Sequence, residues 1–280
     1  MNRQDHMDKY CFHRKSFGIK EHPITKLFED RLFFDSIDYT LEPTVTIENG
    51  KIYPNRLYVI YSYDDCYWEN VNRVSGLIDC IQKEKLLNID TGILDEVLFN
   101  DVIERGARIK TLIAGYDIRD NPELSRVKVS FDVKNNDSSI SNIIKLHGKV
   151  DKVTKFISKN RLLFTVEMRG DGNSRMKIYP VSLHLLPIHR ENLSQKTCKV
   201  IHRSKKVFIT FEPDMSLALN FCVSAKNRDD VYWAGLGELF KNPQFATVFD
   251  SIVDRYEVRI ITVREKEFAR GEVNKINIYY

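Results

Sequence analysis

The chain has 280 residues, 42% of them hydrophobic, which is enough to bury a large core as one large domain or two small ones. Its formal net charge of +4 is too small to argue for a nucleic-acid or membrane surface, and no run of about 18 apolar residues or secretory leader occurs, so we expect a soluble, cytoplasmic protein. Five scattered cysteines without a C-x-x-C pair indicate neither a disulfide framework nor a zinc site.

The first third of the chain alternates helical and extended patterns. Residues 22–35 carry apolar side chains at the spacing of one helical face. Residues 40–61 follow as two strands joined by Asn49-Gly50, a dipeptide that favours a tight hairpin turn. Residues 66–84 return to helical spacing, so the predicted order is helix, strand, strand, helix.

That order repeats along the rest of the chain. Five strand pairs begin at intervals of about 50 residues, a period within the range of repeat architectures. No linker rich in proline, glycine or serine divides the chain, so we predict a single domain over residues 1–280. The later strands are predicted at 108–116, 125–133, 161–169, 175–183, 206–212, 216–224, 257–265 and 274–280, and the later helices at 91–103, 186–193, 228–242 and 244–256.

Several strands have one apolar and one polar face. In residues 126–133, Val and Phe alternate with Arg, Lys, Ser and Asp, and residues 175–179 and 275–279 alternate similarly. Helices need an apolar sheet face to pack on, so the polar faces should point away from them. An open sheet with a solvated basic face is one solution, but ten strands tend to curl, and closing them would place the polar faces inside a barrel.

Short blocks along nearly the whole chain resemble one family. In order, these blocks are "HRKSFGIKEHPITKLFED", "LEPTVTIENGKIYPNR", "GYDIR", "SRVKVSF", "DGNSRMKIY", "VREKEF" and "NKINIYY". Each block is short, and their order and spacing carry the likeness. Together they resemble the cyanobactin prenyltransferases, compact bacterial members of the ABBA (αββα barrel) prenyltransferase group.

The resemblance implies both a fold and an activity. The fold is of the α+β class: a ten-stranded antiparallel β-barrel with a polar lumen, surrounded by helices in αββα repeats. The activity is transfer of an isoprenyl group, dimethylallyl or geranyl, from an allylic diphosphate to a side chain of a ribosomally made cyclic peptide. Mg2+ would assist the diphosphate, although the chain has no Asp-Asp-x-x-Asp metal motif, and we expect a monomer.

Prenyl transfer requires donors for the departing diphosphate, aromatic faces for the allylic cation and a base for the acceptor proton. The resemblance assigns the base to Glu42 on the first hairpin. A plain cross-strand ion pair between Glu42 and Arg56, worth about 0–1 kcal/mol at a surface, is the alternative. The residues implied for binding the diphosphate and prenyl group are Arg56, Lys128, Arg175, Lys177, Tyr179 and Tyr279.

The chain departs from the family pattern at Thr46, Ser130 and Asp132, where the family usually has basic residues or histidine. These changes weaken diphosphate binding, transfer the task to Arg126, Arg175 and Lys177, or leave the site inactive. A carboxylate in the chamber could also hold a guanidinium. We therefore assign acceptor binding to Asp132 and Glu167, and expect an arginine acceptor to compete with tyrosine.

Two other classes of function fit parts of the pattern. A non-catalytic barrel could use a basic lumen to hold an anionic or peptide ligand, in which case Glu42, Arg56, Lys128 and Lys177 need not gather around one cavity. A nucleic-acid-binding sheet would need exposed aromatic residues between its basic positions, and the small net charge argues against it. The histidine spacing fits no metallohydrolase motif.

Overall fold

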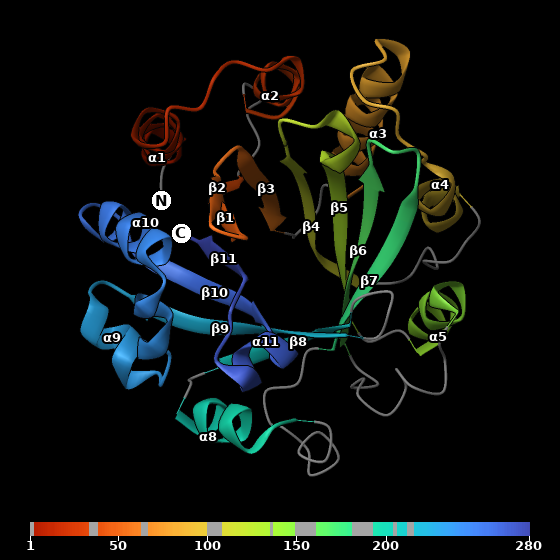
Figure 1. Cartoon of the computed structure of the whole chain (residues 1–280). Helices are drawn as coiled ribbons and strands as arrows, with labels where there is room; N and C mark the ends of the chain where they lie inside the picture. The colour runs from red at the N-terminus through yellow and green to blue at the C-terminus, as the bar shows by residue number, and fades with distance from the viewer. Residues whose placement is uncertain are drawn as a thin grey trace. The chain divides into compact units, whose positions relative to one another are not determined.

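The computed structural model describes residues 3–33, 39–62, 67–99, 108–134, 137–148, 161–180, 193–203, 206–211 and 216–280 (Figure 1). In these residues the strands are β1 (Thr40–Glu48), β2 (Lys51–Tyr53), β3 (Arg56–Ser62), β4 (Arg108–Asp117), β5 (Arg126–Lys134), β6 (Arg161–Arg169), β7 (Ser174–Pro180), β8 (Lys206–Phe211), β9 (Leu217–Ala225), β10 (Val258–Arg264) and β11 (Lys275–Tyr279).

The strands form one antiparallel sheet that closes on itself. Each strand from β11 down to β3 hydrogen-bonds to its neighbour in sequence, β3 pairs with β1, and β11 pairs back with β1 from Thr44↔Tyr279 to Glu48↔Lys275. This closure confirms the predicted antiparallel barrel. The predicted return strand of the first hairpin is divided at Pro54 and Asn55 into β2 and β3, which both pair with β1, so ten strand positions contain eleven strands.

The helices agree with the prediction in part. The pattern over 66–84 forms α3 (Tyr67–Lys83), 244–256 forms α10 (Pro243–Val253), and the described part of 91–103 forms α4 (Gly92–Phe99). The helix over 22–35 begins as α2 (Pro23–Phe28) and continues as the π-helix η1 (Glu29–Phe33). Nearly all of the predicted helix 186–193 lies outside the described residues.

Two other predictions for the helical elements were wrong or incomplete. The single helix over 228–242 is instead α9 (Arg228–Trp233) and the 3-10 helix η4 (Gly237–Lys241), because Gly235 between them has a positive φ of 79°. Four further helices and one 3-10 helix were not predicted: α1 (Arg3–Ser16), η2 (Pro122–Leu124), α5 (Asp137–His147), α8 (Gln195–Arg203) and α11 (Glu265–Arg270), the last lying between β10 and β11.

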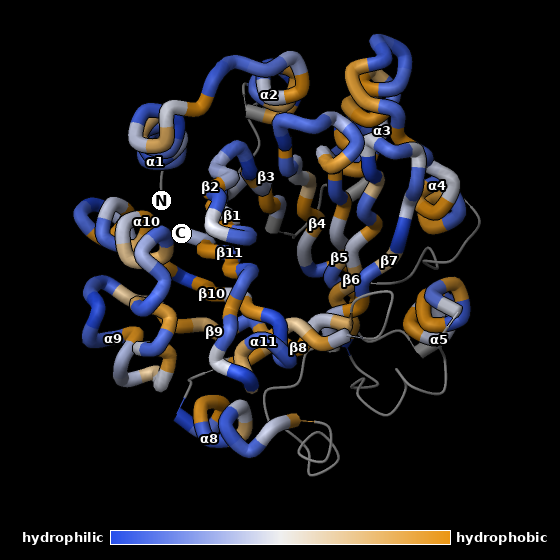
Figure 2. The backbone as a smooth tube through the Cα atoms, viewed as in Figure 1, coloured by the Kyte–Doolittle hydropathy of each residue, from blue (hydrophilic) through white to orange (hydrophobic). Residues whose placement is uncertain are grey.

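The helices cover the apolar faces of the strands. On α3, the residues from Val71 to Ile81 that share one helical face are buried, and this helix packs on β4. Figure 2 shows hydrophobic and hydrophilic residues alternating along strands such as β4 and β5. Both faces of β5 are buried: Val127, Val129 and Phe131 on one side, and Lys128 and Ser130 on the other. The polar face is therefore enclosed, and the solvated basic sheet is excluded for this strand.

The chain divides into two compact units, which we describe separately. Unit 1 contains Met1–Pro43, Asn55–Val150 and Lys159–Lys177, and unit 2 contains Thr44–Pro54, Asp151–Ser158 and Ile178–Tyr280. The single-domain organisation over 1–280 stays a prediction. No helix in the described part of the chain has both the length and the apolar character needed to span a membrane.

Candidate active site

One row of side-chain positions crosses five strands of unit 1. Glu42 on β1 lies opposite Tyr58 on β3, Tyr58 opposite Gly115 on β4, Gly115 opposite Lys128 on β5, and Lys128 opposite Glu167 on β6. Directly opposite residues of paired strands project from the same face of a sheet. Strand pairing therefore brings together a carboxylate, an aromatic ring, an ammonium and a second carboxylate from distant parts of the sequence.

The glycine in this row makes room for the tyrosine. A Cβ added at Gly115 would lie 2.3 Å from Cδ1 of Tyr58 and 2.8 Å from the carbonyl oxygen of Leu57, both closer than real atoms approach. Only a residue without a side chain allows the Tyr58 ring to lie across β4 at this point. Gly115 thus determines where the Tyr58 hydroxyl is held.

That hydroxyl lies between two cations. The Tyr58 oxygen accepts hydrogen bonds from Nη2 of Arg56 at 2.6 Å and from Nζ of Lys128 at 3.2 Å. The Arg56 guanidinium carbon also lies 5.3 Å from the centre of the Tyr58 ring, within the range of cation–π attraction. Arg56 and Lys128, both nearly fully buried, are consequently held on the same aromatic side chain.

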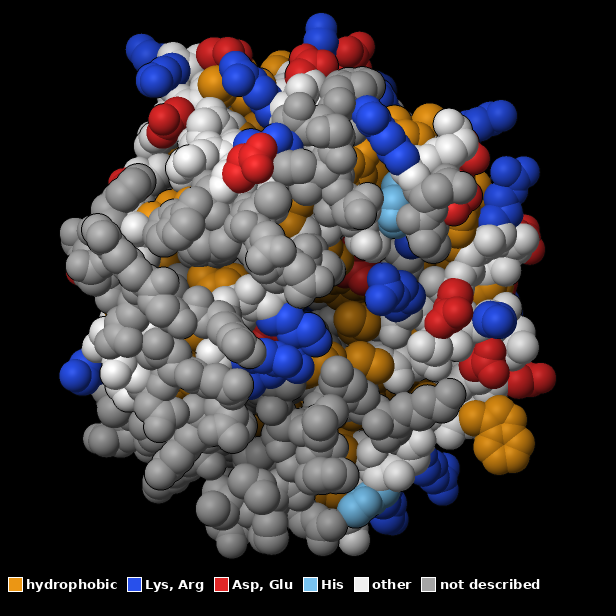
Figure 3. All heavy atoms as spheres, turned by 180° about the vertical axis from the view of Figure 1, so that it is seen from behind, with side chains coloured by type: hydrophobic (Ala, Val, Ile, Leu, Met, Phe, Trp, Pro, Cys, Tyr) orange, Lys and Arg blue, Asp and Glu red, His pale blue; other side chains and the backbone are white. Residues whose placement is uncertain are grey.

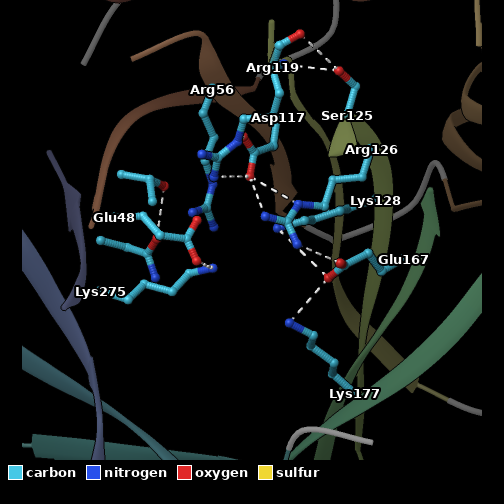
Figure 4. A network of polar contacts seen from close by, with 12 residues as sticks. Glu48, Arg56, Asp117, Arg119, Ser125, Arg126, Lys128, Glu167, Lys177 and Lys275 are labelled. Atoms are coloured by element: carbon cyan, nitrogen blue, oxygen red, sulfur yellow. Dashed lines mark hydrogen bonds and ion pairs between the residues drawn. The ribbon is translucent and has the colours of Figure 1, made fainter. Parts of the chain in front are cut away.

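Glu167 is the centre of a larger group of cations (Figure 4). Its Oε1 accepts hydrogen bonds from Arg126 at 2.7 Å and Arg175 at 2.7 Å. Its Oε2 lies 3.2 Å from Nζ of Lys177 and 4.0 Å from Nζ of Lys128. Oε2 has close ammonium groups but no hydrogen bond of good geometry, so we treat these two contacts as ion pairs only. One fully buried carboxylate thereby positions four cations.

A second buried carboxylate extends the network. Asp117, at the end of β4, binds Nε of Arg119 through Oδ1 at 2.7 Å and Nη2 of Arg126 through Oδ2 at 2.9 Å. The Arg119 backbone N–H donates to Oγ of Ser125 at 2.9 Å, which fixes the loop that carries this guanidinium. Arg126 therefore bridges Asp117 and Glu167, and the two carboxylates belong to one cluster.

The protonation of this cluster follows from burial and charge. Burial by itself would raise the pKa of Glu167, but Lys177, Arg126 and their neighbours outweigh it and hold that pKa well below its usual range. The pKa of Asp117 is lowered in the same way by nearby guanidiniums, Arg126 foremost. Burial lowers the pKa of Lys128 well below its usual value, and Arg56 lowers it further. The lysine, and not either carboxylate, is thus the group whose charge is least stable here.

We call this group of side chains the cation cluster: Arg56, Arg119, Arg126, Lys128, Arg175 and Lys177, with the carboxylates Asp117 and Glu167. With Glu42 opposite Tyr58, the region contains six basic side chains and three acidic ones. Four of the six basic side chains are buried, and a surplus of positive charge attracts anions.

Most of the predicted site residues lie together in this region. Glu42, Arg56, Lys128, Arg175, Lys177 and Glu167 all belong to unit 1. The register places Glu42 opposite Tyr58, two residues from Arg56 along β3. Of the residues predicted for binding the diphosphate, Tyr179 and Tyr279 belong to unit 2, where both are half-buried. Their roles stay predictions.

The two carboxylates predicted to hold the acceptor already bind arginines of the chain. Arg161 binds Asp132 with two hydrogen bonds, Nε to Oδ1 at 2.7 Å and Nη2 to Oδ2 at 2.5 Å. Glu167 binds Arg126 and Arg175, as described above. Neither assignment is tested by these contacts, but an acceptor guanidinium would have to displace an internal partner.

Two of the three departures from the family pattern, Thr46 and Ser130, make neutral polar contacts, whereas Asp132 binds Arg161. In unit 1, Ser130 lies 2.7 Å from Thr165 through their hydroxyl oxygens. In unit 2, the hydroxyl of Thr46 donates to Oδ1 of Asn277 at 2.8 Å, and Thr262 donates to Oδ1 of Asn220 at 2.8 Å. These strands of unit 2 thus present hydroxyl and amide groups where a lysine at Thr46 had been expected.

Mg2+ is the metal that the resemblance implies, and Asp117 and Glu167 are the buried carboxylates that could bind it. Magnesium needs oxygen ligands in an octahedral arrangement, usually including one or two carboxylates. Asp117 and Glu167 are already surrounded by guanidinium and ammonium groups, and the described residues contain no cluster of three His, Cys, Asp or Glu side chains suited to a metal. Asp117 and Glu167 therefore do not fit a protein-held Mg2+.

The sequence reasoning gave no role to Tyr58, Gly115, Asp117 and Arg119. Tyr58 lies two residues after Arg56 and therefore on the same face of the strand. This spacing could have identified Tyr58 as a neighbour of Arg56 in the site. The other three occur at alternate positions of "GYDIR", a block that was noticed for its resemblance alone. The pairing of Asp117 with Arg126 follows from the β4–β5 register, which a sequence does not state.

Comparisons with known proteins agree with this fold. A family profile described as "Family of unknown function (DUF5838)" matches residues 7–280. No curated protein sequence matches the chain. Solved structures match at low identity and therefore bear on the fold alone.

Two of these structures are 6-dimethylallyltryptophan synthases, and a third is a complex with product diphosphate. The 6-dimethylallyltryptophan synthase from Micromonospora olivasterospora, in complex with DMASPP and Trp, matches with a TM-score of 0.65 and 11% identity over 100% of this chain and 97% of its own. A second 6-dimethylallyl tryptophan synthase matches with a TM-score of 0.65 and 10% identity, over 98% of this chain and 94% of its own. PriB, in a binary complex with product diphosphate, matches with a TM-score of 0.59 and 11% identity, over 85% of this chain and 78% of its own.

Proposed function

The chain belongs to the DUF5838 family of unknown function, and from its fold and its cation cluster we propose that it is a prenyltransferase. The donor is an allylic diphosphate with a five- or ten-carbon chain. The acceptor is a tyrosine or arginine side chain of a ribosomally made cyclic peptide. The monomeric state and the cytoplasmic location expected from the sequence are part of this proposal.

The arrangement in unit 1 is the observation that supports it most. A ligand with a diphosphate group needs several cationic donors at fixed positions, and the cation cluster supplies them in strands whose register is set by hydrogen bonding. Glu42 lies in the same row, across Tyr58 from Lys128. A binding barrel without catalysis requires the cations but gives no reason for a carboxylate and an aromatic ring beside them.

The proposed reaction breaks the bond between the allylic carbon and the diphosphate oxygen. The electron pair leaves with the diphosphate, whose negative charge is stabilised by Arg56, Lys128 and Lys177. The allylic cation is stabilised by aromatic faces such as that of Tyr58. The acceptor oxygen or nitrogen then forms the new bond to carbon and loses its proton to the Glu42 carboxylate.

Nucleic acid is not part of the proposal. On the face of the molecule seen in Figure 3, the described lysine and arginine side chains are mixed with aspartate and glutamate. Nucleic-acid-binding surfaces instead concentrate positive charge on one face. The cation cluster of unit 1 is not such a surface, because Arg56, Lys128 and Lys177 within it are buried.

The direct test is incubation with dimethylallyl or geranyl diphosphate and a mixture of cyclic peptides, followed by mass spectrometry. We expect a peptide to gain the mass of one prenyl group. Glu42→Gln should lower turnover by about 10²–10⁴-fold because the base is lost, with the fold intact. Glu84→Gln, at an exposed position directly after α3, is the control and should keep its activity.

Two outcomes would count against the proposal. Donor binding without a mass gain in any peptide would favour the binding barrel. Full activity of Glu42→Gln would remove Glu42 from its role as the base.

The acceptor is tested separately with cyclic peptides that contain only tyrosine or only arginine as a reactive residue. Turnover of the arginine peptide supports the acceptor roles of Asp132 and Glu167. Turnover of the tyrosine peptide alone would leave these carboxylates with the internal arginines that they bind in the structure.

A further inference from the structure

The structure assigns to the cation cluster the role that a divalent metal has in many diphosphate-using enzymes: we propose that this chain binds and ionises its donor without Mg2+. This inference rests on the proposed function. It departs from the Mg2+ assistance that the resemblance implied.

The first reason is the state of the buried carboxylates. Each of the four carboxylate oxygens of Asp117 and Glu167 lies within 3.2 Å of a guanidinium or ammonium nitrogen. A magnesium ion placed on either residue would have to displace these cations from a buried position. Breaking a buried ion pair leaves an uncompensated buried charge and is strongly destabilising.

The second reason is the charge balance. The six basic side chains of the cluster exceed Asp117, Glu167 and the neighbouring Glu42 by three formal charges. An allylic diphosphate carries roughly three negative charges near neutral pH. The donor alone therefore neutralises the surplus, whereas a bound Mg2+ would add two positive charges to a region that is already positive.

The third reason is geometric. The cations reach the row from several directions: Arg56 from β3, Lys128 from β5, and Arg175 and Lys177 from β7. Each is held by a contact to Tyr58 or Glu167 before any ligand arrives. Fixed donors on several sides of an anion supply the charge stabilisation that a metal otherwise provides.

The test measures donor binding apart from turnover. Isothermal titration with inorganic pyrophosphate, and with a thiolodiphosphate analogue of dimethylallyl diphosphate, is carried out in EDTA and again in millimolar Mg2+. We expect the two dissociation constants of each ligand to agree within about threefold. Binding that needs Mg2+ would overturn this inference and leave the proposed function standing, whereas no binding under either condition would overturn both.

A charge-reducing variant sharpens the test. Lys177→Met removes one positive charge beside Glu167, and we expect pyrophosphate binding in EDTA to weaken by at least tenfold, with partial recovery in Mg2+. Arg228→Met removes an exposed arginine that pairs with Asp250 in unit 2. This variant should bind pyrophosphate as the wild type does, both in EDTA and in Mg2+. If Lys177→Met bound pyrophosphate as the wild type does in EDTA, the cluster would not be the metal substitute proposed here.

Discussion

Single residues in the row from Glu42 to Glu167 have roles that depend on their neighbours across the sheet. Lys128 and Arg56 are held by the Tyr58 hydroxyl, and Tyr58 itself is held where Gly115 leaves space. Arg56 is two residues from Tyr58 on the same strand, but Lys128 and Gly115 come from other strands. A substitution at Gly115 should therefore move the Tyr58 ring and, with it, the two cations that its hydroxyl binds.

Replacing Gly115 with alanine should destabilise the protein. The added methyl group would meet the Tyr58 ring and the Leu57 carbonyl, and overpacking of this kind costs about 1–3 kcal/mol. Urea unfolding measures the loss. Gly76→Ala in α3 is the control, because no atom lies within 4 Å of the added group, and it should leave stability unchanged or raise it by up to about 1 kcal/mol. Equal stability of both variants would contradict the close approach of Tyr58 to β4.

Lys128 should make diphosphate binding depend on pH. Burial and the nearby Arg56 lower its pKa, so Lys128 loses its proton at a lower pH than an ordinary lysine does. The site then loses one positive charge as the pH rises through that lowered pKa, and pyrophosphate affinity should fall. Titration calorimetry at a series of pH values up to 10 measures this effect.

Lys128→Arg is the matched control for the pH effect, since a guanidinium keeps its charge throughout this range. The ionisation of pyrophosphate itself contributes equally in both proteins. We therefore expect a smaller dependence on pH in the variant. The same dependence in both proteins would show that the charge of Lys128 does not change in this range and would contradict the prediction.

At the scale of elements, sequence patterns predicted the strands better than the helices. Period-two alternation and the Asn49-Gly50 turn located the strand pairs, because each strand has one apolar face. Helix α1 was missed because its buried face consists of His6, Lys9, Tyr10 and His13, and not of an apolar stripe. Helix α11 buries only Glu265 and Phe268, too few residues to give a periodic signal.

The first hairpin turn provides an element-scale prediction. Asn49 and Gly50 have positive φ values of 51° and 74°, as a two-residue turn of this type requires. Gly50→Ala should cost about 1–2 kcal/mol of unfolding free energy, because a Cβ is unfavourable in this conformation although no atom lies within 4 Å. Urea unfolding beside Gly76→Ala separates this backbone cost from the general effect of adding a methyl group. An unchanged midpoint would contradict the turn geometry.

At the scale of the whole molecule, the barrel fold was predicted correctly, whereas the roles of the predicted site residues stay predictions. Strand alternation allowed both an open sheet and a closed barrel, and the family resemblance favoured the barrel, whose closure is seen in the pairing of β11 with β1. The sequence could not show which polar residues face one another. Arg126 bridging Asp117 and Glu167, and Arg161 binding Asp132, depend on strand register, and they changed how the predicted carboxylates are understood.

Positional isotope exchange tests whether the cation cluster ionises an allylic diphosphate, and the acceptor need not be known for this experiment. Dimethylallyl diphosphate labelled with oxygen-18 in the bridging position is incubated with the protein, with and without cyclic peptides, and recovered for analysis. If the carbon–oxygen bond breaks and re-forms in the site, the label moves to non-bridging positions. We predict this movement in the wild type and its loss in Lys177→Met. Label that stays in the bridge at saturating donor, under every condition, would contradict the account.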